Sequence, residues 1–93
     1  MSRFEWDDAK ADSNRSKHGV TFDDALTVFG DRYALTFFDK AHSQTEDRYL
    51  TLGFAASGKL LLVCHTYRPG AIRLISARPA SRRERQTYAD ARP

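Results

Sequence analysis

The segment Ile72-Arg73-Leu74-Ile75-Ser76-Ala77-Arg78-Pro79-Ala80-Ser81-Arg82-Arg83-Glu84-Arg85 decides the fold, because it joins a strand to a helix. Its first part is rich in aliphatic and β-branched residues and ends at Pro79, which predicts a strand over residues 71–77. Ser81 is followed three residues later by Glu84, the pattern of a capping box, which predicts a helix over residues 82–91.

The corner between this strand and this helix places Arg78, Arg82 and Arg83 near a helix N-terminus. That end of a helix is already electropositive, since its first amide groups have no partners. Arginines there are unfavourable unless an anion lies among them, so the sequence predicts a phosphate-binding corner. Arg78 precedes a proline and is therefore held extended, which favours an outward direction for its side chain. For this segment alone, a solvated basic helix face is the alternative.

Turn and cap residues divide the rest of the chain into shorter elements. We expect an edge strand over residues 4–6, a polar helix over 8–18 and a second helix from Thr21 to Gly30. Further strands are predicted over 33–38, 48–54 and 60–67, and the last should be central because it starts with a continuous apolar run. The second helix carries one apolar stripe, made by Phe22, Ala25, Leu26 and Phe29.

The order β-α-α-β-β-β-β-α predicts an α+β fold with a mostly antiparallel sheet and helices packed on one face. At 93 residues the chain is expected to form a single domain over 1–93. Cys64 is the only cysteine, so no intramolecular disulfide can form, and its apolar neighbours predict a buried thiol. The N-terminus lacks the pattern of a signal peptide and no apolar run is long enough to span a bilayer, which predicts a cytoplasmic protein without membrane contact.

Charge is distributed unevenly along the chain. Residues 1–67 contain eight Lys and Arg against ten Asp and Glu, whereas residues 68–93 contain seven arginines against two acidic residues. Arginine is the cation best suited to bidentate contact with phosphate. The sequence therefore predicts one surface for nucleic acid or for an acidic partner.

Two blocks of residues resemble a known family. The N-terminal block reads Phe4-x-Trp6-Asp7-x-x-Lys10-x-x-x-Asn14-x-x-Lys17-His18-Gly19-Val20-x-Phe22-x-x-Ala25-x-x-Val28-Phe29. The C-terminal block reads Ile72-Arg73-x-Ile75-Ser76-Ala77-Arg78-x-Ala80, followed by Glu84-Arg85-x-x-Tyr88. With Glu46-x-Arg48 and Val63-x-His65-Thr66 between them, these blocks are similar to the BrnT toxins of bacterial type II toxin–antitoxin systems.

The resemblance implies a RelE-like ribonuclease fold and cleavage of RNA without a metal or other cofactor, which would inhibit translation and growth. It also implies a neighbouring BrnA antitoxin with a ribbon-helix-helix domain, which neutralises the toxin and represses the shared operon with it. Operator DNA would then be contacted only through the antitoxin.

Metal-independent cleavage of RNA needs groups that transfer protons and groups that stabilise a phosphorane. The candidates for proton transfer are His65, His18 and Glu46, and the candidates for charge stabilisation are Arg48, Arg73, Arg78 and Lys17. We expect the catalytic residues to be His65, Arg73, Arg78, Glu46 and Arg48. We expect the nucleic-acid-binding residues to be Lys17, His18, Arg82, Arg83 and Arg85.

Several of these residues also allow a structural role. A histidine in a central strand is often a hydrogen-bonded core residue, and this is the main alternative for His65. Arg73 lies mid-strand and could form an ion pair with Glu46 or another carboxylate, and Arg48 could likewise pair with Glu46 or Asp47. The pair Lys17 and His18 could simply cap a helix C-terminus. His42 lies in a polar loop and is expected to be solvated.

The Pro69-Gly70 turn provides a geometric test of one shared site. A strict two-residue loop pairs His65 with Leu74 and Arg73 with Thr66, which places His65 and Arg73 on opposite faces of the sheet. A longer loop or a bulge would instead place His65 opposite Arg73. The sequence does not decide between these registers.

No metal site is predicted, because the histidines and Cys64 lack the spacing that such sites use. Besides an RNA endonuclease, two readings remain open: a non-catalytic nucleic-acid-binding module, and a protein-interaction domain whose basic face contacts an acidic partner.

Overall fold

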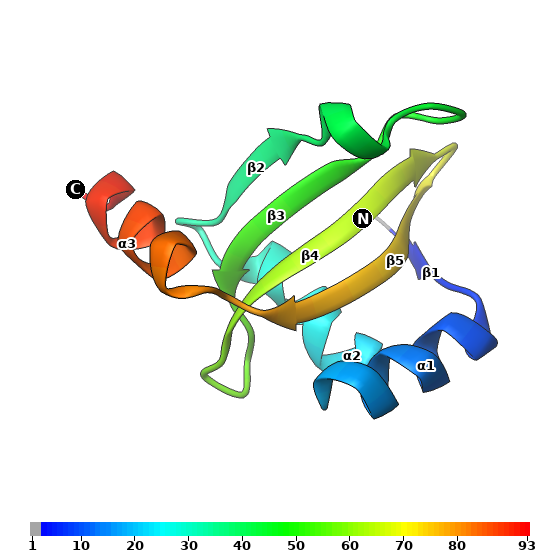
Figure 1. The fold of residues 1–93 in the computed structure, drawn as a ribbon, viewed down its shortest axis with the longest axis horizontal. Helices are drawn as coiled ribbons and strands as arrows, with labels where there is room; N and C mark the ends of the chain where they lie inside the picture. Colours follow the sequence, from blue (N-terminus) through cyan, green and yellow to red (C-terminus); the bar gives the residue numbers. More distant parts are fainter. Residues whose placement is uncertain (1–2) are drawn as a thin grey trace.

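A five-stranded sheet forms the centre of the computed structural model, which describes residues 3–93 (Figure 1). The elements in chain order are β1 (Arg3–Glu5), α1 (Asp8–His18), α2 (Phe22–Ala25), the 3₁₀ helix η1 (Leu26–Gly30), β2 (Leu35–Phe38), the 3₁₀ helix η2 (Lys40–His42), β3 (Tyr49–Phe54), β4 (Leu60–Arg68), β5 (Ala71–Pro79) and α3 (Arg82–Ala91). The strand order is β1-β5-β4-β3-β2, with β1 parallel to β5 and the other neighbours antiparallel. The α+β class and the order of elements are confirmed, while the likeness to the RelE fold stays a prediction.

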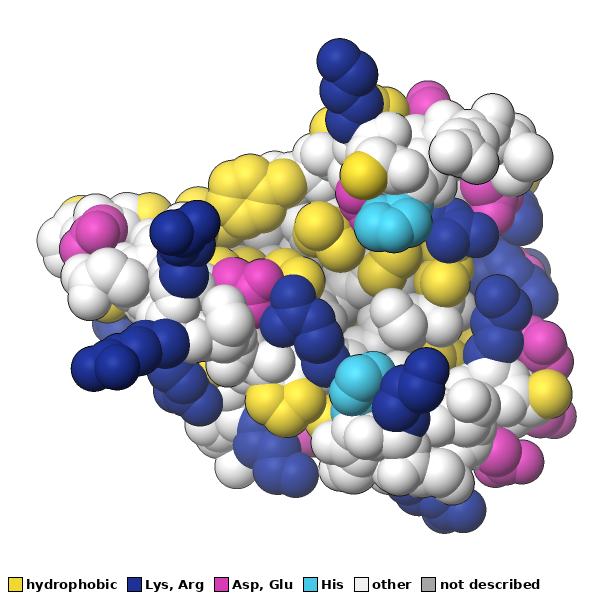
Figure 2. Space-filling model, in the orientation of Figure 1, with side chains coloured by type: hydrophobic (Ala, Val, Ile, Leu, Met, Phe, Trp, Pro, Cys, Tyr) yellow, Lys and Arg dark blue, Asp and Glu magenta, His cyan; other side chains and the backbone are white. Residues whose placement is uncertain are grey.

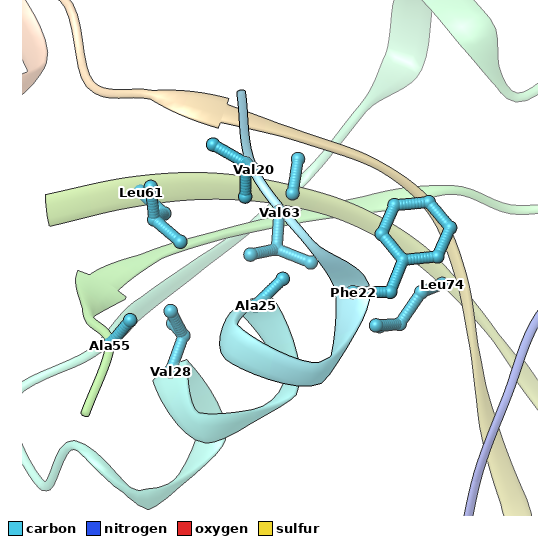
Figure 3. Close-up of a cluster of buried hydrophobic side chains, with 9 residues drawn as sticks. Val20, Phe22, Ala25, Val28, Ala55, Leu61, Val63 and Leu74 are labelled. Atoms are coloured by element: carbon cyan, nitrogen blue, oxygen red, sulfur yellow. The ribbon is translucent and has the colours of Figure 1, made fainter. Parts of the chain in front are cut away.

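The two faces of the sheet are covered unequally. Along β4, Leu61 and Val63 lie in the core beneath α2 and η1, whereas Leu60 and Leu62 point to the other side. Figure 3 shows Ala25 and Val28 directed at Leu61 and Val63. We call the side beneath α1, α2 and η1 the covered face and the other side the open face.

Helix α3 departs from the expected arrangement, because it packs on the open face while the other helices pack on the covered face. Tyr88 contacts Leu52, Leu60 and Leu62 at one end of the sheet. The Tyr88 hydroxyl also donates a hydrogen bond of 2.6 Å to the carboxylate of Asp31. The helix is therefore attached to the sheet mainly through one aromatic residue and leaves the rest of the open face free (Figure 1).

The second predicted helix is shorter than expected and continues as a 3₁₀ helix from Leu26. The buried residues are Phe22, Ala25 and Val28, which are spaced by three and match the three-residue turn of a 3₁₀ helix. Tight packing against the sheet accompanies this spacing, since a Cβ placed on Gly53 would lie 2.9 Å from Val28 Cγ1.

A buried asparagine joins α1 to β5. The Asn14 side-chain amide donates to the carbonyls of Val20 and Ala77 at 3.0 and 2.8 Å, and its oxygen accepts from the Ala77 amide at 2.9 Å. Strand β1 pairs only with residues 71–73 of β5, so the end of α1 lies beside the remainder of that strand. This arrangement brings His18, the last residue of α1, to the rim of the open face.

Candidate active site on the open face of the sheet

A hollow of about 300 Å³ lies on the open face (Figure 2). Leu50, Leu62 and Cys64 from β3 and β4 make its apolar floor, and burial raises the pKa of the Cys64 thiol. The polar lining comes from four separate parts of the chain: His18, Asp39, His42, Arg48, Ser76 and Arg78, with Ile75 beside them. An apolar floor surrounded by a few convergent polar groups is the usual form of a binding site.

Two arginines line the hollow: Arg48, which directly precedes β3, and Arg78, which lies in β5. The Nε atom of Arg48 is buried and has no hydrogen-bond partner within residues 3–93. Arg78 instead holds both carboxylate oxygens of Glu84 at 2.8 Å, and this contact keeps the pKa of Glu84 below its ordinary value. Arg48 is therefore the arginine of the hollow with an unsatisfied donor.

The expected phosphate-binding corner contains its own anion. Glu84 closes the capping box with Ser81 and neutralises Arg78, so the carboxylate occupies the place predicted for a phosphate. Arg82, Arg83 and Arg85 are exposed along α3. The structure thus keeps these three arginines at the surface of α3 and does not gather them around one anion site.

Two histidines line the hollow from α1 and η2, and Figure 2 shows a histidine on either side of it. His18 is the last residue of α1, where the helix dipole stabilises a cation. His42 Nδ1 lies 2.9 Å from Asp39 Oδ2. The Asp39 side chain is only 12% exposed, against 69% for His42. A nearly buried carboxylate therefore orients an exposed imidazole ring.

A second group of charges lies on the same face near the β4–β5 turn. Arg68 Nη1 contacts Glu46 Oε2 at 2.7 Å, and Arg73 Nη1 contacts Glu5 Oε2 at 3.0 Å. The hydrogen bond from Arg68 lowers the pKa of Glu46, and the charges of Arg48 and Arg73 act in the same direction. Four predicted catalytic residues therefore share the open face: Glu46, Arg48, Arg73 and Arg78.

His65 lies on the covered face and apart from these four residues. Its side chain is fully buried, its Nε2 lies 2.7 Å from the Thr51 hydroxyl, and its ring packs edge-on against Phe29. Burial lowers its pKa to about 4, which keeps the ring neutral near pH 7. A buried, neutral ring facing the core fits the alternative of a hydrogen-bonded core histidine and gives RNA no access to it.

The hairpin register explains this separation. Arg68 pairs with Ala71, His65 with Leu74 and Thr66 with Arg73, as a strict two-residue loop requires. Gly70 has a φ of 71°, the left-handed value that the second central position of a type II turn needs. A bulge does occur in the hairpin, but it lies further along, between Cys64 and His65, and leaves the partners of His65 unchanged.

Sequence reasoning missed Asp39 and the place of His42. A pair of residues three apart in a polar loop is a weak signal, because most such loops are solvated. The two residues reach the hollow only because the segment of η2 folds back on the start of β3, where the Asp39 amide donates a hydrogen bond of 2.8 Å to the carbonyl of Arg48. Lys17 is exposed and lies with His18 beside Ile75 and Ser76 in an adjoining shallow groove.

Among residues 3–93, no helix combines the length and the apolar composition needed to cross a membrane. Nor do three or more His, Cys, Asp or Glu side chains in this range cluster as ligands for a metal ion.

Comparison with known proteins identifies the family. Residues 6–84 match the family described as "Ribonuclease toxin, BrnT, of type II toxin-antitoxin system". The chain belongs to the BrnT family. It is also similar to the ribonuclease toxin BrnT of Brucella abortus, known from a 1.1 Å crystal structure, with a TM-score of 0.70 and 27% identity; the match covers 88% of this chain and 100% of that one. No curated protein matches the chain. Membership of the BrnT family makes it a ribonuclease toxin with an antitoxin partner.

Proposed function

We propose that this BrnT toxin is a metal-independent endoribonuclease that binds its RNA substrate across the open face. The observation that carries the proposal is the hollow of about 300 Å³, which gathers two arginines and two histidines over an apolar floor. A nucleotide base can rest on the apolar floor while its phosphate meets the arginines.

Arg48 is the principal phosphate contact in this proposal. Its buried Nε lacks a partner within the described residues 3–93, and an unsatisfied buried donor is costly until an acceptor reaches it. A phosphate oxygen supplies that acceptor and is held more strongly as it gains negative charge in the phosphorane. Arg78 lines the hollow from β5, and Glu84 balances its charge and holds its guanidinium in place.

The arginines outside the hollow extend the binding surface. Arg73, next to the β4–β5 turn, and Arg82, Arg83 and Arg85, along α3, can contact neighbouring phosphates of the same strand. Lys17 and His18 lie on the α1 side of the hollow. Glu46 serves in this scheme to orient Arg68 and the neighbouring arginines.

The biological consequences follow from the family. Cleavage of RNA would inhibit translation and growth in the cytoplasm, and a BrnA antitoxin with a ribbon-helix-helix domain would neutralise it. That antitoxin would cover the open face, and the complex would repress its own operon, with operator DNA contacted only by the antitoxin.

Cleavage of a labelled RNA by the purified chain in excess chelator, with and without ribosomes, tests the proposal. We expect discrete cuts by the parent and a loss of about 10²–10³-fold in rate for Arg48→Ala, the range for removing one donor to a developing oxyanion. The matched control is Arg15→Ala, since Arg15 is exposed and lies beside Trp6 and Phe22 away from the hollow. Bound but intact RNA under all conditions would instead support a non-catalytic binding module.

A further inference from the structure

We infer that His42, held by Asp39, is the general base of RNA cleavage and that His18 is the general acid. The inference rests on the proposed ribonuclease function and assigns the proton transfers within it. It gives a role to His42, whose side chain is exposed, as the sequence predicted.

The hydrogen bond to Asp39 determines which ring nitrogen of His42 is free. Because Nδ1 lies 2.9 Å from a carboxylate oxygen, Nδ1 carries a proton and Nε2 keeps its lone pair. The nearly buried carboxylate also stabilises the imidazolium that forms once Nε2 has taken a proton. This pairing of a base with an orienting carboxylate is what a neutral general base requires.

The surroundings of His18 differ from those of His42, because His18 lies at a helix C-terminus and His42 lies beside a carboxylate. His18 is the last residue of α1, at the helix end where the unpaired carbonyls and the helix dipole favour a hydrogen-bond donor. It lines the same hollow as His42 but comes from a different element. The other charged groups that line the hollow are Asp39, Arg48 and Arg78, and Arg48 is the one proposed to hold the phosphate.

The proposed step is balanced by these two residues alone. Nε2 of His42 takes the proton of the ribose 2′-hydroxyl, and the 2′-oxygen forms a bond to phosphorus. The bond between phosphorus and the 5′-oxygen breaks, and that oxygen receives a proton from His18. The products are a 2′,3′-cyclic phosphate and a 5′-hydroxyl end.

A substrate with a sulfur leaving group separates the two roles. The cut sites of the parent are first mapped on an oligonucleotide, and sulfur then replaces the 5′-bridging oxygen at one of them. A sulfur leaves without being protonated, so loss of the general acid no longer slows cleavage of this substrate. Loss of the general base still slows it, because the 2′-hydroxyl must still be deprotonated.

With the natural substrate we expect His42→Ala and His18→Ala each to lower the cleavage rate about 10²–10⁴-fold. With the sulfur substrate, His18→Ala should regain nearly the parent rate and His42→Ala should not. Asp39→Asn should lower the rate at least about tenfold and leave RNA binding intact, because it removes the control of the His42 tautomer and the charge beside its imidazolium but no phosphate contact. Lys59→Ala, in the exposed β3–β4 turn, is the matched control.

Circular dichroism and RNA retention check that each variant is folded and still binds. Parent-like rates for folded His42→Ala, or rescue of His42→Ala by sulfur, would overturn the assignment while leaving the ribonuclease function in place. If the parent itself makes no cut with or without ribosomes, the proposed function fails and this inference fails with it.

Discussion

At the residue scale, His65 makes stability depend on pH. Burial lowers its pKa to about 4, below the ordinary value near 6.5, so between these values the unfolded chain binds a proton that the folded one does not. Stability is therefore full above about pH 6.5 and falls as the pH drops towards 4. We expect the free energy of unfolding to fall by about 1 kcal/mol between pH 7 and 5.5, where carboxylates contribute little. Urea unfolding of the parent and of His65→Gln measures this, and equal pH dependence in both would contradict it.

Individual residues were predictable where their role is local and were not where it depends on distant contacts. The sequence indicated that Arg73 could pair with a carboxylate, but the partner is Glu5, and only the parallel β1–β5 pairing brings the two together. The arginines of the strand-to-helix corner were recognised, yet the anion among them is Glu84, which the sequence already contained as a helix cap. The place of His42 at the hollow could not be predicted, because it depends on where η2 packs in the folded protein.

At the element scale, α3 depends on the contact between Tyr88 and Asp31. Burial raises the pKa of Tyr88 to about 12, so its hydroxyl stays protonated and donates to Asp31. Burial alone would raise the pKa of Asp31, but this bond and those from the amides of Phe54 and Tyr33 hold it below its ordinary value. We expect Tyr88→Phe to reduce the free energy of unfolding by about 1–2 kcal/mol.

Amide hydrogen exchange along α3 checks this prediction, since detachment of the helix exposes its amides before the sheet opens. Thr87→Ala is the matched control because Thr87 is exposed on the same helix. Unchanged protection of the α3 amides in Tyr88→Phe would show that the apolar contacts with Leu52, Leu60 and Leu62 hold the helix alone.

Elements with local start and stop signals were predictable to the residue. Both α1 and α3 have the expected bounds, because Asp7, Gly19 and the Ser81–Glu84 capping box act within one turn of the chain. The bounds of the second helix were not predictable in this way. The apolar stripe in the sequence is compatible with an α-helix, but close packing against Gly53 favours the tighter 3₁₀ turn. The sequence also could not predict on which face of the sheet α3 packs, because this depends on the direction in which the chain leaves β5.

At the scale of the whole molecule, the uneven distribution of charge along the sequence becomes an uneven distribution of charge over the surface. The open face collects Arg48 and the arginines of β4 and β5 and lies next to α3, while several of these arginines are balanced by carboxylates from other elements. Composition predicted a basic surface for nucleic acid but could not predict which cations remain unpaired. That distinction decides which arginines release counterions when RNA binds.

The salt dependence of RNA binding measures this distinction directly. Arg82 and Arg83 are exposed at the start of α3, and each phosphate contact to a single strand contributes about 0.7 to the slope of log K against log salt. We expect the double variant Arg82→Ala with Arg83→Ala to lower that slope by about 1.4 for a non-cleavable RNA analogue. The matched control, Arg15→Ala with Lys59→Ala, removes the same charge away from the open face and should change the slope far less. Equal changes in both double variants would mean that RNA responds to net charge and not to the open face.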